Sequence, residues 1–219
     1  MSKGLHLIQI SLKGLAGFVT ADQLQLRTRL RDFKYPDGDE ARARIAYYRD
    51  ARQAVVAYHR NNQSSTWLLQ RAGELDLSAQ TAGDRVRTRL MHNARALREY
   101  HDCFANRRFD EVLPRLQLAV MHAGVRVSVT PDLHVRERGK ERFLKLEFGV
   151  EPLQEMSAKV MTQAMFDAVA QSGHGVTSNS VLVRDVASGR DIAGARSGAR
   201  MNRLIHATCL NIAAIWDSV

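Results

Sequence analysis

The sequence predicts an α+β protein, in which a mostly helical N-terminal half (residues 1–124) precedes a half of β-β-α-β-α order (residues 125–219). Two observations lead to this fold class. Before Gly124, apolar residues recur with the 3.6-residue period of a helix, and from Val125 they recur with the two-residue period of a strand. The length of 219 residues and the apolar content of 45% suit a sizeable core, which the two halves either share or divide.

The chain carries a net charge of +9, because 32 basic residues, 26 of them arginine, outnumber 23 acidic ones. Such a surplus attracts polyanions, and nucleic acid is the commonest of them. Arginine also donates paired hydrogen bonds to phosphate. DNA or RNA is therefore the expected partner. Two alternatives remain open: a GC-rich genome raises the arginine content, or a basic subunit docks on other protein subunits of a larger complex.

The sequence indicates no membrane segment and no secretion signal. No apolar run approaches the ~18 residues that cross a bilayer, and the N-terminus lacks a small-residue cleavage site. Cys103 and Cys209 lie far apart in apolar helical contexts, and they match neither a zinc-site spacing nor a disulfide framework. We therefore expect a reduced, cytoplasmic protein.

The N-terminal half begins with LHLIQISL, a weakly alternating segment that favours a strand or a short apolar anchor. Thr20 is a candidate N-cap for a short helix that ends near Phe33. After the turn YPDGD, Asp39 can cap a helix that runs to about Arg60. Further helices are predicted over residues 65–78, 80–105 and 107–124, the last of them stopped by Gly124.

A row of basic residues marks the helix that ends near Arg60. Arg42, Arg49 and Arg60 return to nearly the same angle, opposite an apolar face. The row either tracks a phosphate backbone or is simply a solvated face. His59 falls on the apolar side, where a hydrogen-bonded core histidine is expected rather than a ligand.

The C-terminal half begins with two strands, residues 125–135 and 142–150, that pair around a turn centred on Arg138 and Gly139. The other predicted elements are a helix over residues 155–171, two short strands joined by a Ser-Gly turn within SVLVRDVASGRDIAG, and a helix from Arg200 to about Trp216.

The paired strands bring candidate catalytic residues together. With the turn at this position, Asp132 lies opposite Lys145, and Glu147 follows one pleat further along. Arg126 shares the polar face of the first strand. Carboxylates from two strands offer the hard oxygen ligands that a divalent cation prefers, and a nearby ammonium group can stabilise negative charge on a phosphate. The alternative is an ordinary ion pair between Asp132 and Lys145 on a half-exposed sheet.

These residues resemble the core hairpin of the PD-(D/E)XK nuclease superfamily, in which a Pro-Asp in one strand precedes an acidic-x-Lys in the next. The corresponding segments here are Pro131-Asp132 and Lys145-Leu146-Glu147. The predicted helix that contains Gln163, in the setting TQAMF, is similar to the glutamine helix of the helicase-nuclease branch. The strand and turn that follow this helix in that branch are similar to the segment SVLVRDVASGRDI. The resemblance covers about residues 110–195 and leaves the first hundred residues aside.

The resemblance implies that Asp132 and Glu147 hold Mg²⁺ or Mn²⁺, with Lys145 beside the scissile phosphate, in an endonuclease or exonuclease acting on DNA or RNA. One departure concerns the order of the motif. The acidic residue follows the lysine, so that Glu147 lies two residues, or about 6.6 Å, beyond its expected place. An active nuclease and a degenerate member that keeps the shape and the charge without catalysis or metal therefore both remain open.

A glycine-rich basic segment, SGRDIAGARSGAR, follows the nuclease-like region. Its arginines could clamp phosphates, or they belong to a flexible basic loop. The predicted nucleic-acid contacts are Arg42, Arg49, Arg60, Arg126, Gln163, Arg190, Arg196 and Arg200.

Overall fold

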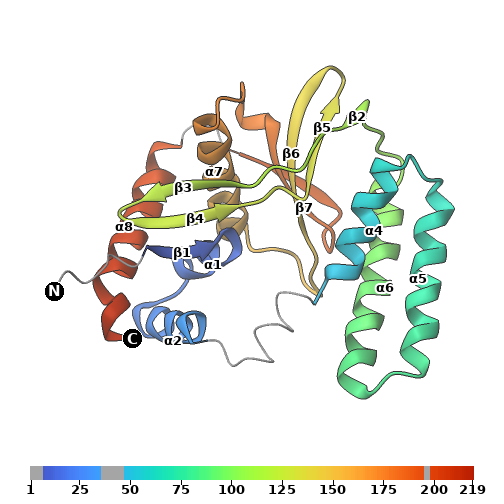
Figure 1. Ribbon diagram of the computed structural model, residues 1–219, viewed down its shortest axis with the longest axis horizontal. Helices are drawn as coiled ribbons and strands as arrows, with labels where there is room; N and C mark the ends of the chain where they lie inside the picture. Colours follow the sequence, from blue (N-terminus) through green and yellow to red (C-terminus); the bar gives the residue numbers. More distant parts are fainter. Residues whose placement is uncertain (1–6, 36–46, 195–197) are drawn as a thin grey trace.

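The computed structural model describes residues 7–35, 47–194 and 198–219 and has the predicted α+β class (Figure 1). Two sheets form its framework. In the three-stranded sheet, β1 (Ile8–Ser11) runs parallel to β4 (Val125–Val129), and β3 (Leu118–His122) pairs with β4 in the antiparallel sense. The five-stranded sheet has the order β2 (Glu111–Val112), β5 (Leu133–Glu137), β6 (Lys140–Glu147), β7 (Val181–Asp185) and β8 (Arg190–Ala193).

The first core forms where helices cover the three-stranded sheet. These helices are α1 (Leu12–Val19), α2 (Gln23–Lys34), α7 (Glu155–Gln171) and α8 (Ala199–Ile215). Helix α7 also packs on β7 of the other sheet, so that it lies between the two sheets (Figure 1). Buried Leu15 of α1 and Met165 of α7 belong to this core.

The second core lies on the face of the five-stranded sheet that points away from α7. Alternating Leu133, Val135, Leu144 and Leu146 of β5 and β6 pack there against α4 (Arg49–Arg60) and α6 (Asp84–Phe104). Helix α5 (Ser65–Gln80) packs on the outer side of α6 (Figure 1). Both cores contain residues from each side of Gly124, and residues 1–124 and 125–219 thus pack on one another.

The helix predicted over residues 107–124 is wrong. This segment instead contains β2 and β3, and Ala123 and Gly124, with φ of 48° and 79°, form the turn of a hairpin with β4. The short apolar run LAVMH suits a strand as well as a helix, and its pairing with β4, such as Val120 with Val127, buries Val120. We expected Gly124 to end a helix, whereas its positive φ serves a hairpin turn.

The strand predicted over residues 125–135 is also corrected, since it divides at Thr130–Asp132 into β4 and β5, which belong to different sheets. At the N-terminus, Asp22 rather than Thr20 caps the first predicted helix, through a 2.8 Å hydrogen bond from Gln25 N–H to Asp22 Oδ1. Asp39 lies outside the described residues. The predicted helices at residues 155–171 and from Arg200 onward correspond to α7 and α8.

Candidate functional site

The β5–β6 hairpin places Asp132 opposite Lys145, as predicted. Its turn is made by Arg138 and Gly139, with φ of 53° and 73°, which is the conformation of a two-residue hairpin turn. The register pairs Leu133 with Leu144, and Asp132 N–H donates to Leu144 O at 2.8 Å. The regular ladder ends at Leu133, because its next step would pair Asp132 with Lys145 and not with Leu144.

Asp132 is 6% exposed and is held by three groups at once. Lys145 Nζ lies 3.1 Å from Asp132 Oδ2, and Arg52 Nε of α4 lies 3.3 Å from Oδ1. The backbone N–H of Leu146 donates to Oδ2 at 2.9 Å. Because β5 begins only at Leu133, the Asp132 carboxylate supplies the acceptor that a backbone carbonyl would otherwise provide. Asp132 therefore has a structural role in addition to its charge.

Glu147 lies at the end of β6 and is 4% exposed. It pairs with a different basic side chain from those that contact Asp132. Lys13 of α1 donates to Glu147 Oε2 at 2.5 Å, and the Lys13 side chain is 66% exposed. Each of the two carboxylates thus has its own positive partner. A divalent ion bound by both would compete with Lys13 for Glu147, and with Lys145 and Arg52 for Asp132.

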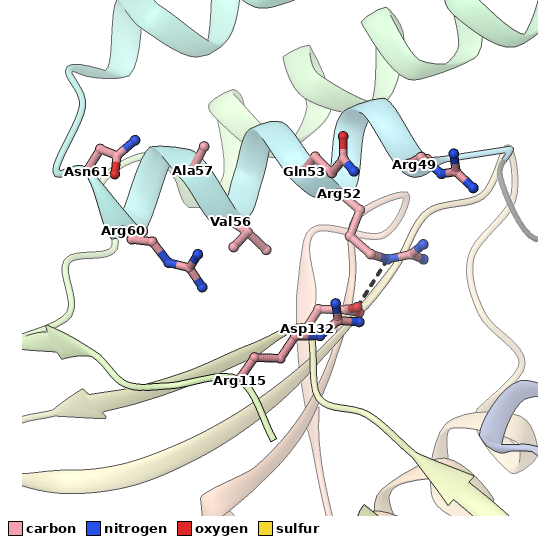
Figure 2. Close-up of a pocket in the computed structure, with 9 residues that line it drawn as sticks. All are labelled: Arg49, Arg52, Gln53, Val56, Ala57, Arg60, Asn61, Arg115 and Asp132. Atoms are coloured by element: carbon pink, nitrogen blue, oxygen red, sulfur yellow. Dashed lines mark ion pairs between the residues drawn. The ribbon is translucent and has the colours of Figure 1, made fainter. Parts of the chain in front are cut away.

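Asp132 also forms part of the wall of a cavity of about 590 Å³ beneath α4 (Figure 2). The other lining residues come from α4, from its C-cap residue and from the loop between β2 and β3: Arg49, Arg52, Gln53, Val56, Ala57, Arg60, Asn61 and Arg115. Figure 2 shows Arg52 and Arg60 descending from α4, and Arg115 lying beside Asp132. Four guanidinium groups against one carboxylate make this cavity strongly positive.

Arg52 pairs with Asp132, whereas within the described residues neither Arg60 nor Arg115 pairs with a carboxylate. Arg60 also lines a second cavity of about 670 Å³, where Arg108 adds another guanidinium group. The positive surface therefore continues past the C-terminal end of α4. A guanidinium group without a protein partner is suited to bind phosphate oxygens.

The structure brings only part of the predicted contact set into this cavity. Arg49 and Arg60 line it, as the helical row predicted, while Arg42 and Arg196 lie outside the described residues. Three further predicted contacts, Arg126, Arg190 and Arg200, are exposed on β4, on β8 and on α8, and they are not among the residues that line the cavity.

Gln163 is 8% exposed within α7, and its side chain has another environment. Its amide donates to Asp167 Oδ1 at 2.9 Å. It also packs on Gly198, the N-cap of α8, where an added Cβ would lie 2.6 Å from Gln163 Oε1. Gln163 thus links α7 to the start of α8. Its hydrogen bond is made within α7, and not to the hairpin residues.

Three residues of the site were missed from the sequence. Arg52 follows Arg49 by three residues, so the helical period could have placed both on one side. Arg115 lies in a loop without a periodic pattern, and Lys13 approaches Glu147 across 134 residues of sequence. No local signal indicates either of these contacts.

His59 is a buried core residue, as predicted. Its Nε2 lies 2.7 Å from the Tyr100 hydroxyl group. Burial lowers the pKa of His59 to about 3, with Arg184 and Arg108 adding electrostatic repulsion of its charged form. Arg184 is itself buried and binds both carboxylate oxygens of Asp191, at 2.7 and 2.9 Å. This polar network ties α4 and α6 to β7 and β8.

No family model matches this chain, and a search of curated proteins finds no match either. In the described part of the chain, none of the helices combines the length and the apolar character that crossing a bilayer requires.

Proposed function

We propose that this protein binds the phosphate backbone of a nucleic acid in the cavity beneath α4. The observation that carries the proposal is the gathering of Arg49, Arg52, Arg60 and Arg115 around a single carboxylate that Arg52 and Lys145 already neutralise. Guanidinium groups of α4 and of the loop between β2 and β3 therefore line the same cavity. The net charge of +9 adds long-range attraction for a polyanion.

The proposal predicts binding that weakens steeply as salt rises, because each neutralised phosphate releases condensed counterions. Fluorescence anisotropy with labelled single-stranded DNA, duplex DNA and RNA measures this directly at several salt concentrations. Affinity that does not change with salt would contradict the proposal. Comparison of the three probes identifies the nucleic acid.

A second function, metal-dependent cleavage of a phosphodiester, is favoured by the contact between Asp132 and Lys145. The chain order supports it: β5 and β6 form a hairpin, α7 crosses over, and β7 returns parallel to β6. The same order and the Pro-Asp before β5 underlie the resemblance to the PD-(D/E)XK superfamily. In this proposal Asp132 and Glu147 would hold Mg²⁺ or Mn²⁺, and the ion would activate water for attack on phosphorus.

The residues fit a metal ion only if Lys13 leaves Glu147 and Arg52 leaves Asp132 Oδ1. The Lys13 side chain is 66% exposed and that of Arg52 is 29% exposed, so both can move, whereas Lys145, 17% exposed, would remain beside Asp132 and stabilise charge on the phosphate. Incubation of supercoiled DNA, linear DNA and RNA with Mg²⁺ or Mn²⁺ tests the cleavage proposal. Salt-sensitive binding without cleavage of any substrate would identify a degenerate member that binds and does not cut.

An alternative function is that of a non-enzymatic basic subunit in a larger protein or nucleoprotein complex, in the cytoplasm. Exposed apolar side chains on α5 and α6 favour it, namely Leu69, Leu77, Val86 and Met91. Sedimentation velocity of the purified protein, alone and with nucleic acid, tests this alternative. Monomers at every concentration and no partner on isolation from its native source would count against it.

A further inference from the structure

A second group of polar side chains lies on the β5–β6 hairpin and beside it, and its members are not among the residues that line the arginine-lined cavity. It consists of His134 on β5, Glu141 on β6 and His174 in the segment between α7 and β7. One ligand atom from each of the three lies within 4.8 Å of the others. Two imidazoles and one carboxylate form a typical ligand set for zinc.

The hydrogen bonds of His134 orient its free nitrogen toward Glu141. His134 Nδ1 lies 3.1 Å from Pro114 O and must donate there, because a carbonyl oxygen only accepts. In the neutral ring, Nε2 then carries a lone pair, which lies 3.6 Å from Glu141 Oε2. His134 is 6% exposed, and this Nε2 is buried without a hydrogen-bond partner. Two electron-rich atoms thus lie close together, a buried nitrogen of His134 and an oxygen of the partly exposed Glu141.

The distances suit a single ion between the three side chains. Ligand atoms that surround tetrahedral zinc at 2.0–2.1 Å lie about 3.3 Å from one another. The separation of Glu141 Oε2 is 3.6 Å from His134 Nε2 and 3.2 Å from His174 Nδ1. A backbone carbonyl that accepts from the second nitrogen of a histidine is also the usual outer support of a metal ligand.

The surroundings leave Glu141 available to the two histidines. Arg136 is its register partner across the strands, yet the Arg136 guanidinium group binds Glu111 at 2.5 Å. The adjacent Arg142 lies 3.4 Å from Glu137. Phe143 stacks on the His134 ring at a centroid distance of 4.7 Å and closes one side, while His174, 29% exposed, leaves the other side open to solvent.

We propose that His134, Glu141 and His174 bind one Zn²⁺ or a similar late transition-metal ion. Three protein ligands leave a coordination position for water or for another ligand. The ion would join the segment before β7 to the hairpin. Imidazole ligands favour such ions over Mg²⁺, and this site is therefore distinct in chemistry from the one at Asp132. The inference does not rest on the proposed binding of nucleic acid.

The test uses full-length protein without a histidine tag, freed of metal by a chelator that is then removed. Calorimetric titration with Zn²⁺ should saturate at one equivalent, Co²⁺ should acquire visible absorption, and Zn²⁺ should raise the Tm. His174→Gln and Glu141→Gln should weaken Zn²⁺ binding at least about tenfold. Both positions are partly exposed, so both variants should fold with the Tm of the metal-free parent.

The matched control is His101→Gln. His101 Nδ1 lies 2.9 Å from Asp102 Oδ1, and among residues 7–35, 47–194 and 198–219 this imidazole–carboxylate pair has no third ligand group beside it. Zn²⁺ binding should be unchanged in this variant. The proposal is overturned if the parent binds no Zn²⁺ at one equivalent, or if His174→Gln and Glu141→Gln bind it as tightly as the parent does.

Discussion

Lys13 Nζ lies 2.5 Å from Glu147 Oε2, so that α1 supplies the counterion for the buried carboxylate at the end of β6. The two residues are 134 positions apart in sequence. This contact matters for the cleavage proposal, because the ammonium group of Lys13 binds the Glu147 oxygen that a divalent ion would have to bind. It makes Lys13 the most informative residue at which to separate metal binding from nucleic-acid binding.

Replacing Lys13 with methionine should remove this competition. We expect the free energy of unfolding to fall by about 1–2 kcal/mol, less than for a fully buried pair because Lys13 is 66% exposed. Mn²⁺ affinity should rise, since Glu147 is left without its cation. Urea denaturation and Mn²⁺ titration measure the two effects.

The control for this variant is Lys159→Met, which breaks the exposed pair with Glu155 on α7 and should change the stability much less than Lys13→Met does. A double-mutant cycle of Lys13→Met with Glu147→Gln isolates the pairwise interaction. A coupling energy of zero would show that the two residues do not interact in solution.

Asp132→Asn should act in opposite directions on binding and on cleavage. It removes the one negative charge of the arginine-lined cavity while keeping an oxygen to accept from Leu146 N–H. Nucleic-acid affinity should therefore rise by severalfold, whereas metal-dependent cleavage should be lost. The change leaves Lys145 and Arg52 without a counterion and should cost about 2 kcal/mol of stability. Unchanged cleavage would exclude Asp132 as a metal ligand.

Replacing both Arg60 and Arg115 with alanine should weaken binding and lower its salt dependence. Loss of two phosphate contacts reduces the slope of log K against log salt by about 1.8 for duplex DNA. The matched control, Arg27→Ala with Arg85→Ala, removes the same charge from exposed positions on α2 and α6. An equal reduction in both double variants would indicate that only net charge matters and would contradict a localised site.

The buried His59 should make the protein less stable in mild acid. Its pKa is about 3 in the folded protein, against about 6.5 when unfolded, and the unfolded chain therefore binds more protons between these values. Stability should be full above pH 6.5 and should fall as pH decreases, with His59 contributing a loss of about 2 kcal/mol by pH 5.

His59→Gln removes this titration, and urea denaturation at several pH values should show a flatter profile. Gln retains a polar group that can meet the Tyr100 hydroxyl group, which lies 2.7 Å from His59 Nε2 in the parent. Parallel profiles of His59→Gln and the parent would contradict the assignment.

Local patterns predicted much of the secondary structure. The helical period identified α7 and α8, and the hairpin turn at Arg138 and Gly139 set the register that places Asp132 opposite Lys145. These features depend on neighbours within a few residues, whose side chains and backbone angles the sequence specifies directly. The helix predicted over residues 107–124 failed because a short apolar run allows either period, and pairing with β4 decided in favour of a strand.

The sequence by itself determined the α+β class, the positive charge of the chain and the pairing of Asp132 with Lys145. Tertiary structure alone decided which cations meet the carboxylates and which arginines share a cavity. Lys13, Arg52 and Arg115 reach the site from α1, α4 and a loop, and no sequence spacing connects them. Packing of the helices on the two sheets brings these charges together, because each helix buries its apolar face and thereby aims its polar side chains.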